Sequence, residues 1–259
     1  MAFTFYGFSE KSPHHRLNED SFKTGDNFVV ISDGMGGEQS GEIASKIVVD
    51  CIYDYLKNMV SMEQKEEEIR DSLKYIIKEA DAKIQNYIAA NPDSFGMGAT
   101  VIVAFFQTEK LILAWVGDSH CFLYRDGSLV SLSKDHSYVE NLIDEGKISR
   151  EESFQHPQNN LVTRYIGGGE EWCKPDIKSS PLKPDDVVIL CSDGLSGYCR
   201  EEEIENECET DVQPKRLIKR LSRQSKFNGC DDDLTIVVAT TREGENNILQ
   251  RCLNRIFRK

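Results

Sequence analysis

The sequence predicts an α+β fold built in layers, rather than a parallel sheet in which strands and helices alternate one for one. Three observations carry this prediction. Short apolar strand patterns are grouped together, helical patterns interrupt them in pairs, and 39 % of the 259 residues are hydrophobic, which allows a sizeable core. The length fits one large domain, and we expect the whole chain, residues 1–259, to form it.

The N-terminal part of the chain combines two strand patterns with two helices. Residues 3–9 alternate in the manner of a strand. The apolar run 27–31 stops at Ser32-Asp33-Gly34, as a buried strand does when it enters a turn. Apolar residues then recur at steps of three and four over 43–55 and over 69–88, which predicts two amphipathic helices.

The rest of the chain is rich in strands, with helices at a few places. Strand patterns cover 99–106, 111–116, 121–124, 187–190 and 234–239, and Arg125-Asp126-Gly127-Ser128 has the composition of a hairpin turn. Helical patterns cover 138–145, 214–224 and, in the tail, 246–257. Apart from its short helix, the segment 134–170 is polar and irregular, and the strand 187–190 ends at Ser192-Asp193-Gly194.

The charge and the cysteines narrow the class of protein. A formal net charge of −13 repels phosphate backbones, which argues against nucleic acid and anionic membranes as partners. No run of about 18 apolar residues is present, and the N-terminus lacks the basic start and apolar stretch of a signal peptide. No two of the eight cysteines are separated by only two residues, so we expect reduced thiols rather than a zinc site. We therefore expect a cytoplasmic monomer.

Four aspartates share one sequence context at the ends of predicted strands. Asp33, Asp118 and Asp193 follow apolar strands directly, and Asp232 precedes one. If these strand ends converge, several carboxylates crowd one place, and a hard divalent cation allows them to stay ionised together. Because the ligands would all be oxygens, Mg²⁺ or Mn²⁺ is favoured over zinc or copper. Taken singly, each aspartate is better explained by ordinary turn chemistry, so the prediction depends on all four.

Eight short motifs, in order along the chain, resemble the metal-dependent protein phosphatases of type 2C in their bacterial form. They are Asn18-Glu19-Asp20, Asp33-Gly34-Met35-Gly36-Gly37, Gly96-Met97-Gly98-Ala99-Thr100, Val116-Gly117-Asp118-Ser119, Lys134-Asp135-His136-Ser137, Leu161-Val162-Thr163-Arg164-Tyr165-Ile166-Gly167, Cys191-Ser192-Asp193-Gly194-Leu195 and Asp232-Asp233-Leu234-Thr235. The resemblance runs from about Tyr6 to Ala239. It implies a four-layer α/β/β/α sandwich of two mostly antiparallel sheets flanked by helices, with a flap beside the active site at about 134–170.

The resemblance also implies an activity, hydrolysis of phosphoserine and phosphothreonine in proteins. Two cations, Mn²⁺ or Mg²⁺, would lie about 4 Å apart and share a water whose pKa falls from ~15.7 towards ~7, and the resulting hydroxide would attack phosphorus. A third ion is seen in bacterial relatives. By this resemblance, Asp33 would bridge the two metals, the Gly34 carbonyl would bind one of them, and Asp193 and Asp232 would complete the site of the other. Glu19 and Asp20 would hold metal-bound waters. Asp118 would contribute to the third metal site.

Two positions depart from the family pattern. Where the family commonly has a phosphate-binding arginine, five residues before Asp20, this chain has His15, and Arg16 follows one place later. Either side chain is a candidate: Arg16 as a bidentate fork, or His15 as a cation near pH 6. Of the two, we expect Arg16→Ala to raise KM for a phosphopeptide more than His15→Ala. Met35 stands where animal members have a histidine proposed as general acid, and a methionine has no proton to donate.

Two other functions are compatible with the same residues. A catalytically weak signalling module would keep the fold and only bind partners, and the His15 departure is its sole support. An enzyme acting on small phosphoesters would keep the metal site, and a panel of substrates would separate it from a protein phosphatase. Phosphorylated proteins are the expected partners.

Overall fold

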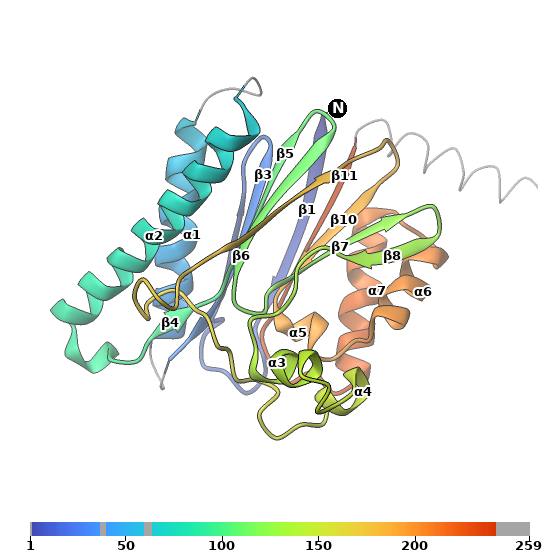
Figure 1. Cartoon of the computed structure of the whole chain (residues 1–259). Helices are drawn as coiled ribbons and strands as arrows, with labels where there is room; N and C mark the ends of the chain where they lie inside the picture. Colours follow the sequence, from blue (N-terminus) through green and yellow to red (C-terminus); the bar gives the residue numbers. More distant parts are fainter. Residues whose placement is uncertain (1, 37–39, 60–63, 242–259) are drawn as a thin grey trace, which may run out of the picture.

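A computed structural model describes residues 2–36, 40–59 and 64–241. Two β-sheets face each other, and a pair of long helices covers the outer side of each (Figure 1). The predicted α/β/β/α sandwich is therefore confirmed. None of the helices in these ranges combines the length and the apolar character needed to cross a bilayer.

Both sheets are antiparallel throughout. The five-stranded sheet has the order β1-β11-β10-β7-β8, and the six-stranded sheet has the order β2-β3-β5-β6-β9, with β4 paired to β3. The strands are β1 Phe3–Glu10, β2 Asp20–Thr24, β3 Phe28–Met35, β4 Gly98–Ala99, β5 Val101–Gln107, β6 Lys110–Val116, β7 His120–Arg125, β8 Ser128–Ser131, β9 Asp176–Pro181, β10 Val187–Cys191 and β11 Leu234–Thr241.

The helices divide between the two outer layers and one end of the sandwich. In Figure 1, α1 and α2 cover the six-stranded sheet, α6 and α7 cover the five-stranded sheet, and α3, α4 and α5 lie together at one end. Their bounds are α1 Gly41–Asn58, α2 Glu66–Ala90, α3 Tyr138–Asp144, α4 Arg150–Ser153, α5 Asp193–Ser196, α6 Glu201–Thr210 and α7 Pro214–Phe227, with a 3₁₀ turn at Pro92–Ser94.

Apolar alternation on the strands builds three cores. Between the sheets, Phe106, Leu190 and Val237 belong to a cluster contributed by both inner faces. A second cluster joins α1 and α2 to the six-stranded sheet, and a third joins α6 and α7 to the other. Each fully buried aliphatic side chain in these clusters contributes roughly 1.5–3 kcal/mol relative to an exposed one. This packing fixes the strand ends that carry the aspartates.

The structure departs from the predicted elements in several places. Strand β3 does not stop at Ser32 but continues to Met35, because Gly34 and Met35 pair with Ala99 and Gly98 of β4. After Ser192 the chain enters the short helix α5 rather than a plain turn. The strands β2 and β9 and the helices α4 and α6 were not predicted, because their sequences are polar and show little periodicity. The predicted helix at 246–257 lies outside the described residues.

The cysteines agree with the expected reduced state. The seven that fall in the described ranges are free thiols, and all but Cys230 are buried. Cys191 is the last residue of β10 and lies in the outer core beneath α6 and α7, and burial raises the pKa of its thiol well above the ordinary value. A thiol held in its neutral form is a poor nucleophile.

Candidate active site

Aspartates from both sheets converge at the end of the sandwich where α3, α4 and α5 lie. Asp33 is in β3 and stands directly opposite Asp20 of β2. Asp193 is the first residue of α5, directly after β10, and Asp232 lies two residues before β11. Asp118 is in the turn between β6 and β7, where the chain passes from one sheet to the other. The four strand-end aspartates of the sequence are thus brought together, with Asp20 as a fifth.

These carboxylates are too close together to be ionised at the same time. Asp33 is flanked by the carboxylates of Asp20 and Asp193, and like charges this close disfavour each other's ionised form. Burial, together with the neighbouring carboxylates, raises the pKa of both well above the ordinary range. For the same reasons the pKa of Asp20 and that of Asp118 rise to about 7. The site therefore concentrates negative charge that the protein itself does not neutralise.

Two buried oxygen atoms at the centre of the cluster have no protein partner. Oδ1 of Asp20 and Oδ1 of Asp193 make no hydrogen bond to any of the described residues. A buried carboxylate oxygen without a donor is costly unless a cation binds it. Since the converging ligands are carboxylates and backbone carbonyls, the cluster fits a hard divalent cation such as Mg²⁺ or Mn²⁺.

Two hydroxyl residues tie the aspartates to one another. Ser192 Oγ donates to Oδ2 of Asp20 at 2.7 Å and accepts the backbone N–H of Thr235 at 3.0 Å, which joins the two sheets at the site. Thr100 Oγ1 accepts the backbone N–H of Asp33 at 3.0 Å and lies 2.7 Å from Oγ of Ser119. The predicted ligands therefore sit on a hydrogen-bonded frame rather than on free loops.

Glycine is required where Glu19, Gly34 and the start of α1 meet. The backbone N–H of Gly34 donates to the carbonyl of Glu19 at 3.0 Å. A Cβ on Gly34 would lie 1.9 Å from the carbonyl oxygen of Gly41, and one on Gly41 would lie 2.6 Å from the Glu19 carboxylate and 2.9 Å from the Gly34 carbonyl oxygen. This close approach brings the Glu19 carboxylate and the Gly34 carbonyl into one region.

Asp233 organises the site, although the sequence analysis assigned it no role. Its buried carboxylate accepts the backbone N–H of Ser12 on Oδ1 and that of Glu19 on Oδ2, both at 2.6 Å. Its Oδ2 also lies 3.1 Å from Nδ1 of His15. The run of three aspartates from Asp231 to Asp233 was the available signal, but sequence gives no indication that the third residue would hold a distant loop.

His15 and Arg16 are placed differently. His15 is half-buried, lines the cleft described below, and has Nδ1 3.9 Å from Oδ1 of Asp232. Burial alone would lower the pKa of His15, but the carboxylates of Asp233, Asp232 and Glu19 outweigh burial and raise it. Arg16 is exposed and is not among the residues that line the cleft. The structure thus places His15, and not Arg16, beside the aspartates.

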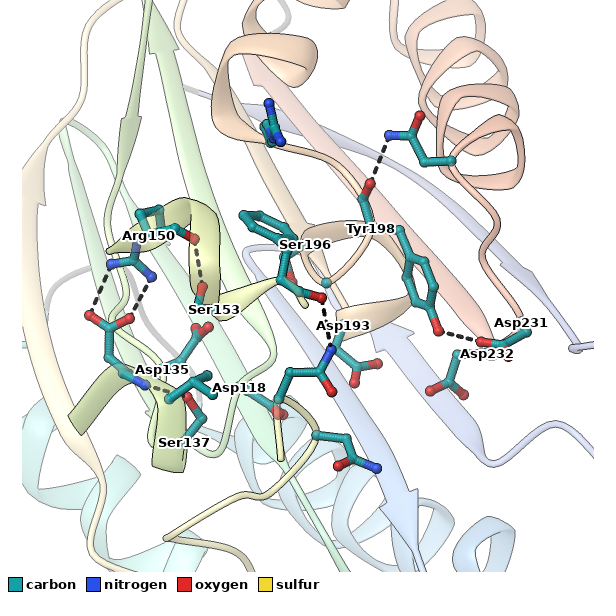
Figure 2. A pocket seen from close by; sticks show the side chains of 18 of the residues that line it. Asp118, Asp135, Ser137, Arg150, Ser153, Asp193, Ser196, Tyr198, Asp231 and Asp232 are labelled. Atoms are coloured by element: carbon teal, nitrogen blue, oxygen red, sulfur yellow. Dashed lines mark hydrogen bonds and ion pairs between the residues drawn. The ribbon is translucent and has the colours of Figure 1, made fainter. Parts of the chain in front are cut away.

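A cleft of about 820 Å³ opens over the aspartates. Figure 2 shows Asp193 with Arg150 of the flap on one side and Tyr198 and Asp231 on the other. On the flap side, Arg150 makes a bidentate pair with Glu140, at 2.5 and 3.0 Å. On the opposite side, the Tyr198 hydroxyl donates to Asp231 at 2.5 Å. Both walls are therefore held by polar contacts, and the mostly charged and polar lining suits a polar ligand rather than an apolar one.

His136 supports the Asp118 turn from behind. Its Nδ1 accepts the backbone N–H of Gly117 at 3.1 Å, and its ring stacks on Trp115 with centroids 6.0 Å apart. Its Nε2 lies 3.3 Å from Oδ2 of Asp176. Burial and the charge of Arg164 lower the pKa of His136, which keeps the imidazole neutral. This histidine is a structural residue of the flap.

Known proteins resemble this chain over nearly its whole length. A family model described as "Protein phosphatase 2C" matches residues 14–237. The serine/threonine phosphatase stp of Listeria welshimeri is 31 % identical over 243 residues, which cover 92 % of this chain and 93 % of the relative. The crystal structure of the Mycobacterium tuberculosis serine/threonine phosphatase PstP/Ppp superposes with a TM-score of 0.84 at 30 % identity, covering 93 % of this chain and 99 % of that one.

One further solved structure bears on the metal. The catalytic domain of the serine/threonine protein phosphatase PstP in complex with two manganese ions has a TM-score of 0.80 at 29 % identity, covering 92 % of this chain and 98 % of that one. The matches in sequence and in fold agree with the cluster of carboxylates at the end of the sandwich. The chain belongs to the protein phosphatase 2C family, and it is a serine/threonine phosphatase of the metal-dependent, bacterial type.

Proposed function

We propose that this phosphatase hydrolyses phosphoserine and phosphothreonine in proteins with two divalent cations, Mn²⁺ or Mg²⁺, and that residues 1–259 act as a single-domain monomer. The observation that carries the proposal is the crowding of buried carboxyls around Asp33, with two buried carboxylate oxygens, on Asp20 and Asp193, that have no partner among the described residues. Such crowding is stable near neutral pH when cations replace the shared protons.

The proposed ligands are those that the resemblance to the family implies, and the crowding of the carboxylates supports them. Asp33, at the centre of the cluster, would bridge the two cations, with the Gly34 carbonyl on one and with Asp193 and Asp232 on the other. Glu19 and Asp20 would orient water in the ligand sphere, and Asp118 would help to hold a third, weaker ion. When bound, the cations supply a water of pKa lowered towards ~7 and positive charge for the phosphoryl oxygens.

The side chains of the protein bind and orient the substrate around that centre. His15 faces Asp232 in the cleft, and its raised pKa favours the imidazolium, which donates hydrogen bonds to a phosphate oxygen. Arg16 reaches the phosphate only if the exposed loop around it shifts. No covalent intermediate is needed, and Cys191, buried with a raised thiol pKa, is unsuited to form one.

The test is phosphate release from a phosphothreonine peptide with Mn²⁺, with Mg²⁺ and with a chelator. We expect release only with metal, at a kcat/KM well above that for small phosphoesters such as p-nitrophenyl phosphate. Release that persists in the chelator would contradict the metal assignment. Equal efficiency toward peptides and small esters would contradict protein as the substrate class.

A further inference from the structure

We propose that the outer face of α7 is a docking site for an acidic, extended segment of the phosphoprotein substrate. The proposal rests on the proposed function, because it concerns the substrate of that same site. In a chain of net charge −13, the 14 residues of α7 contain no acidic residue and six basic ones. These are Lys215, Arg216, Lys219, Arg220, Arg223 and Lys226.

The packing of α7 leaves most of this charge on the surface. Leu217, Ile218 and Leu221 are buried in the outer core beneath the helix. Arg220 is turned toward α6, where its Nε lies 2.6 Å from Oε2 of Glu207. The remaining face carries Lys215, Lys219, Arg223 and Lys226, all exposed, which we call the basic stripe.

The middle of the basic stripe is not neutralised by the protein. Lys219 and Arg223 make no hydrogen bond or ion pair with any residue in the described ranges. At the two ends of the stripe, Lys215 lies over the ring of Tyr6, 5.7 Å from its centroid, and Lys226 pairs with Glu10 at 2.7 Å. Both of these partners belong to β1, so the stripe runs beside that strand.

Strand β1 offers backbone groups next to the basic stripe. It is the last strand of its sheet, and in the described part of the chain it pairs with β11 alone. An edge strand presents unpaired N–H and C=O groups to which an extended segment can hydrogen-bond. From Lys215 to Lys226 the helix rises about 16 Å, which about five extended residues span. A short run of Asp or Glu therefore fits both the charge and the length.

The same features argue against a membrane as the occupant. A helix that lies in a bilayer interface inserts its apolar face, and the apolar face of α7 is already buried against the sheet. The net charge of −13 also repels an anionic surface at longer range, whereas an acidic peptide contacts only the local positive field.

The stripe ends beside the active-site cleft. The chain leaves α7 through Asn228 and leaves β1 through the loop that carries His14 and His15, and all three residues line the cleft. The cleft itself is lined by several carboxylates, among them Asp118, Asp193 and Asp232. An acidic segment held by the basic stripe would therefore lie beside the cleft, which the phosphorylated residue of the same substrate enters.

The experiment compares Lys219→Glu/Arg223→Glu with a matched control, Lys74→Glu/Lys78→Glu. Lys74 and Lys78 are also four residues apart and exposed, on α2 at the opposite outer layer, so both variants change the net charge equally. The substrates are two phosphothreonine peptides that carry six glutamates or six glutamines after a flexible spacer of about 12 residues. At low ionic strength, we expect the α7 variant to have an about tenfold higher KM for the glutamate peptide, with unchanged kcat. Its KM for the glutamine peptide should not change.

Three outcomes would overturn the docking proposal. The first is equal KM values for the two peptides with the unsubstituted protein. The second is an equal rise in KM for the glutamate peptide in the α2 variant. The third is a rise in KM in the α7 variant that persists in 0.5 M NaCl. A separate measurement is fluorescence anisotropy of an unphosphorylated hexaglutamate peptide. If that peptide binds the unsubstituted protein and the α2 variant but not the α7 variant, while no phosphopeptide is hydrolysed with any metal, docking stands and the proposed function fails.

Discussion

The carboxylate of Asp233 accepts the backbone N–H of Glu19 at 2.6 Å, across more than two hundred residues of sequence. Its second oxygen accepts the N–H of Ser12 at the same distance. Asp233 therefore fixes both ends of the loop that carries His15, directly beside Asp232. The geometry of the proposed phosphate site depends on a residue that itself has no proposed contact with phosphate.

Asp233→Asn is expected to destabilise the fold, because it places an NH₂ group against a backbone N–H while leaving the volume unchanged. The loss of one charge-assisted hydrogen bond and the unsatisfied donor together cost about 1–3 kcal/mol. Urea unfolding in the presence of a chelator measures this change. Asp231→Asn is the control, because Asp231 is exposed and we expect a smaller effect there. Equal midpoints for the two variants would show that Asp233 does not hold the loop.

Asp193→Ala is expected to abolish Mn²⁺-dependent phosphate release while the protein stays folded. The side chain lies at the cleft, has a buried oxygen without a partner among the described residues, and belongs to no apolar cluster. Activity and circular dichroism on the same samples check the two halves of this prediction. Full activity in the folded variant would remove Asp193 from the metal site.

Asp118→Asn is expected to stabilise the metal-free protein at pH 8 but not at pH 4. The pKa of Asp118 rises to about 7 on folding, so between about pH 4 and pH 7 the folded state binds more protons than the unfolded state. The free energy of unfolding therefore falls as pH rises through that window. Asparagine removes this loss, which is up to about 4 kcal/mol at pH 8.

Thermal unfolding in a chelator at the two pH values tests the Asp118 prediction. Addition of Mn²⁺ should raise the Tm of the unsubstituted protein more at pH 8 than at pH 4, since the cation binds ionised carboxylates. A pH-independent gain in the variant would mean that Asp118 is not part of the crowded cluster.

The KM values of the variants His15→Ala and Arg16→Ala distinguish which of the two residues binds the phosphate. The sequence alone favoured Arg16, whose removal was expected to raise KM for a phosphopeptide more than that of His15. Because the structure puts His15 in the cleft and Arg16 outside its lining, we now expect the reverse order, with several-fold higher KM for His15→Ala. A larger effect of Arg16→Ala would indicate that the loop moves when substrate binds.

The sequence was sufficient for elements with strong periodicity. Strand β5 is a nearly continuous apolar run, and helix α2 has apolar residues at steps of three and four. Their predicted positions agree with the structure to within about three residues. Strand β2 was missed because Asp20–Thr24 has only one large apolar residue, Phe22, and its pairing with β3 is a tertiary contact. The continuation of β3 through Asp33 was missed for the same reason, since Gly34 pairs with Ala99 far along the chain.

For the site, sequence predicted which residues meet but not how they are held. The four strand-end aspartates are recognisable only as a set, because ordinary turn chemistry explains each of them taken singly. The supports are ordinary in sequence: Thr100, Ser192 and His136 become meaningful only when the fold brings them to Asp33, Asp20 and the Asp118 turn. The choice between His15 and Arg16 likewise depends on the path of one loop, which local residue preferences do not determine.

The aspartates of the site belong to different sheets, so the site is complete only where the two sheets meet. Asp20 and Asp33 come from the six-stranded sheet, Asp193 and Asp232 flank strands of the five-stranded sheet, and Asp118 is on the turn between them. Neither sheet alone contains a complete site. An ion bound to aspartates of both sheets would therefore hold the two sheets together at this end of the sandwich. Catalytic competence would then require that the two sheets be packed against each other. Metal binding would therefore depend on the correct packing of the two sheets, in addition to its role in catalysis.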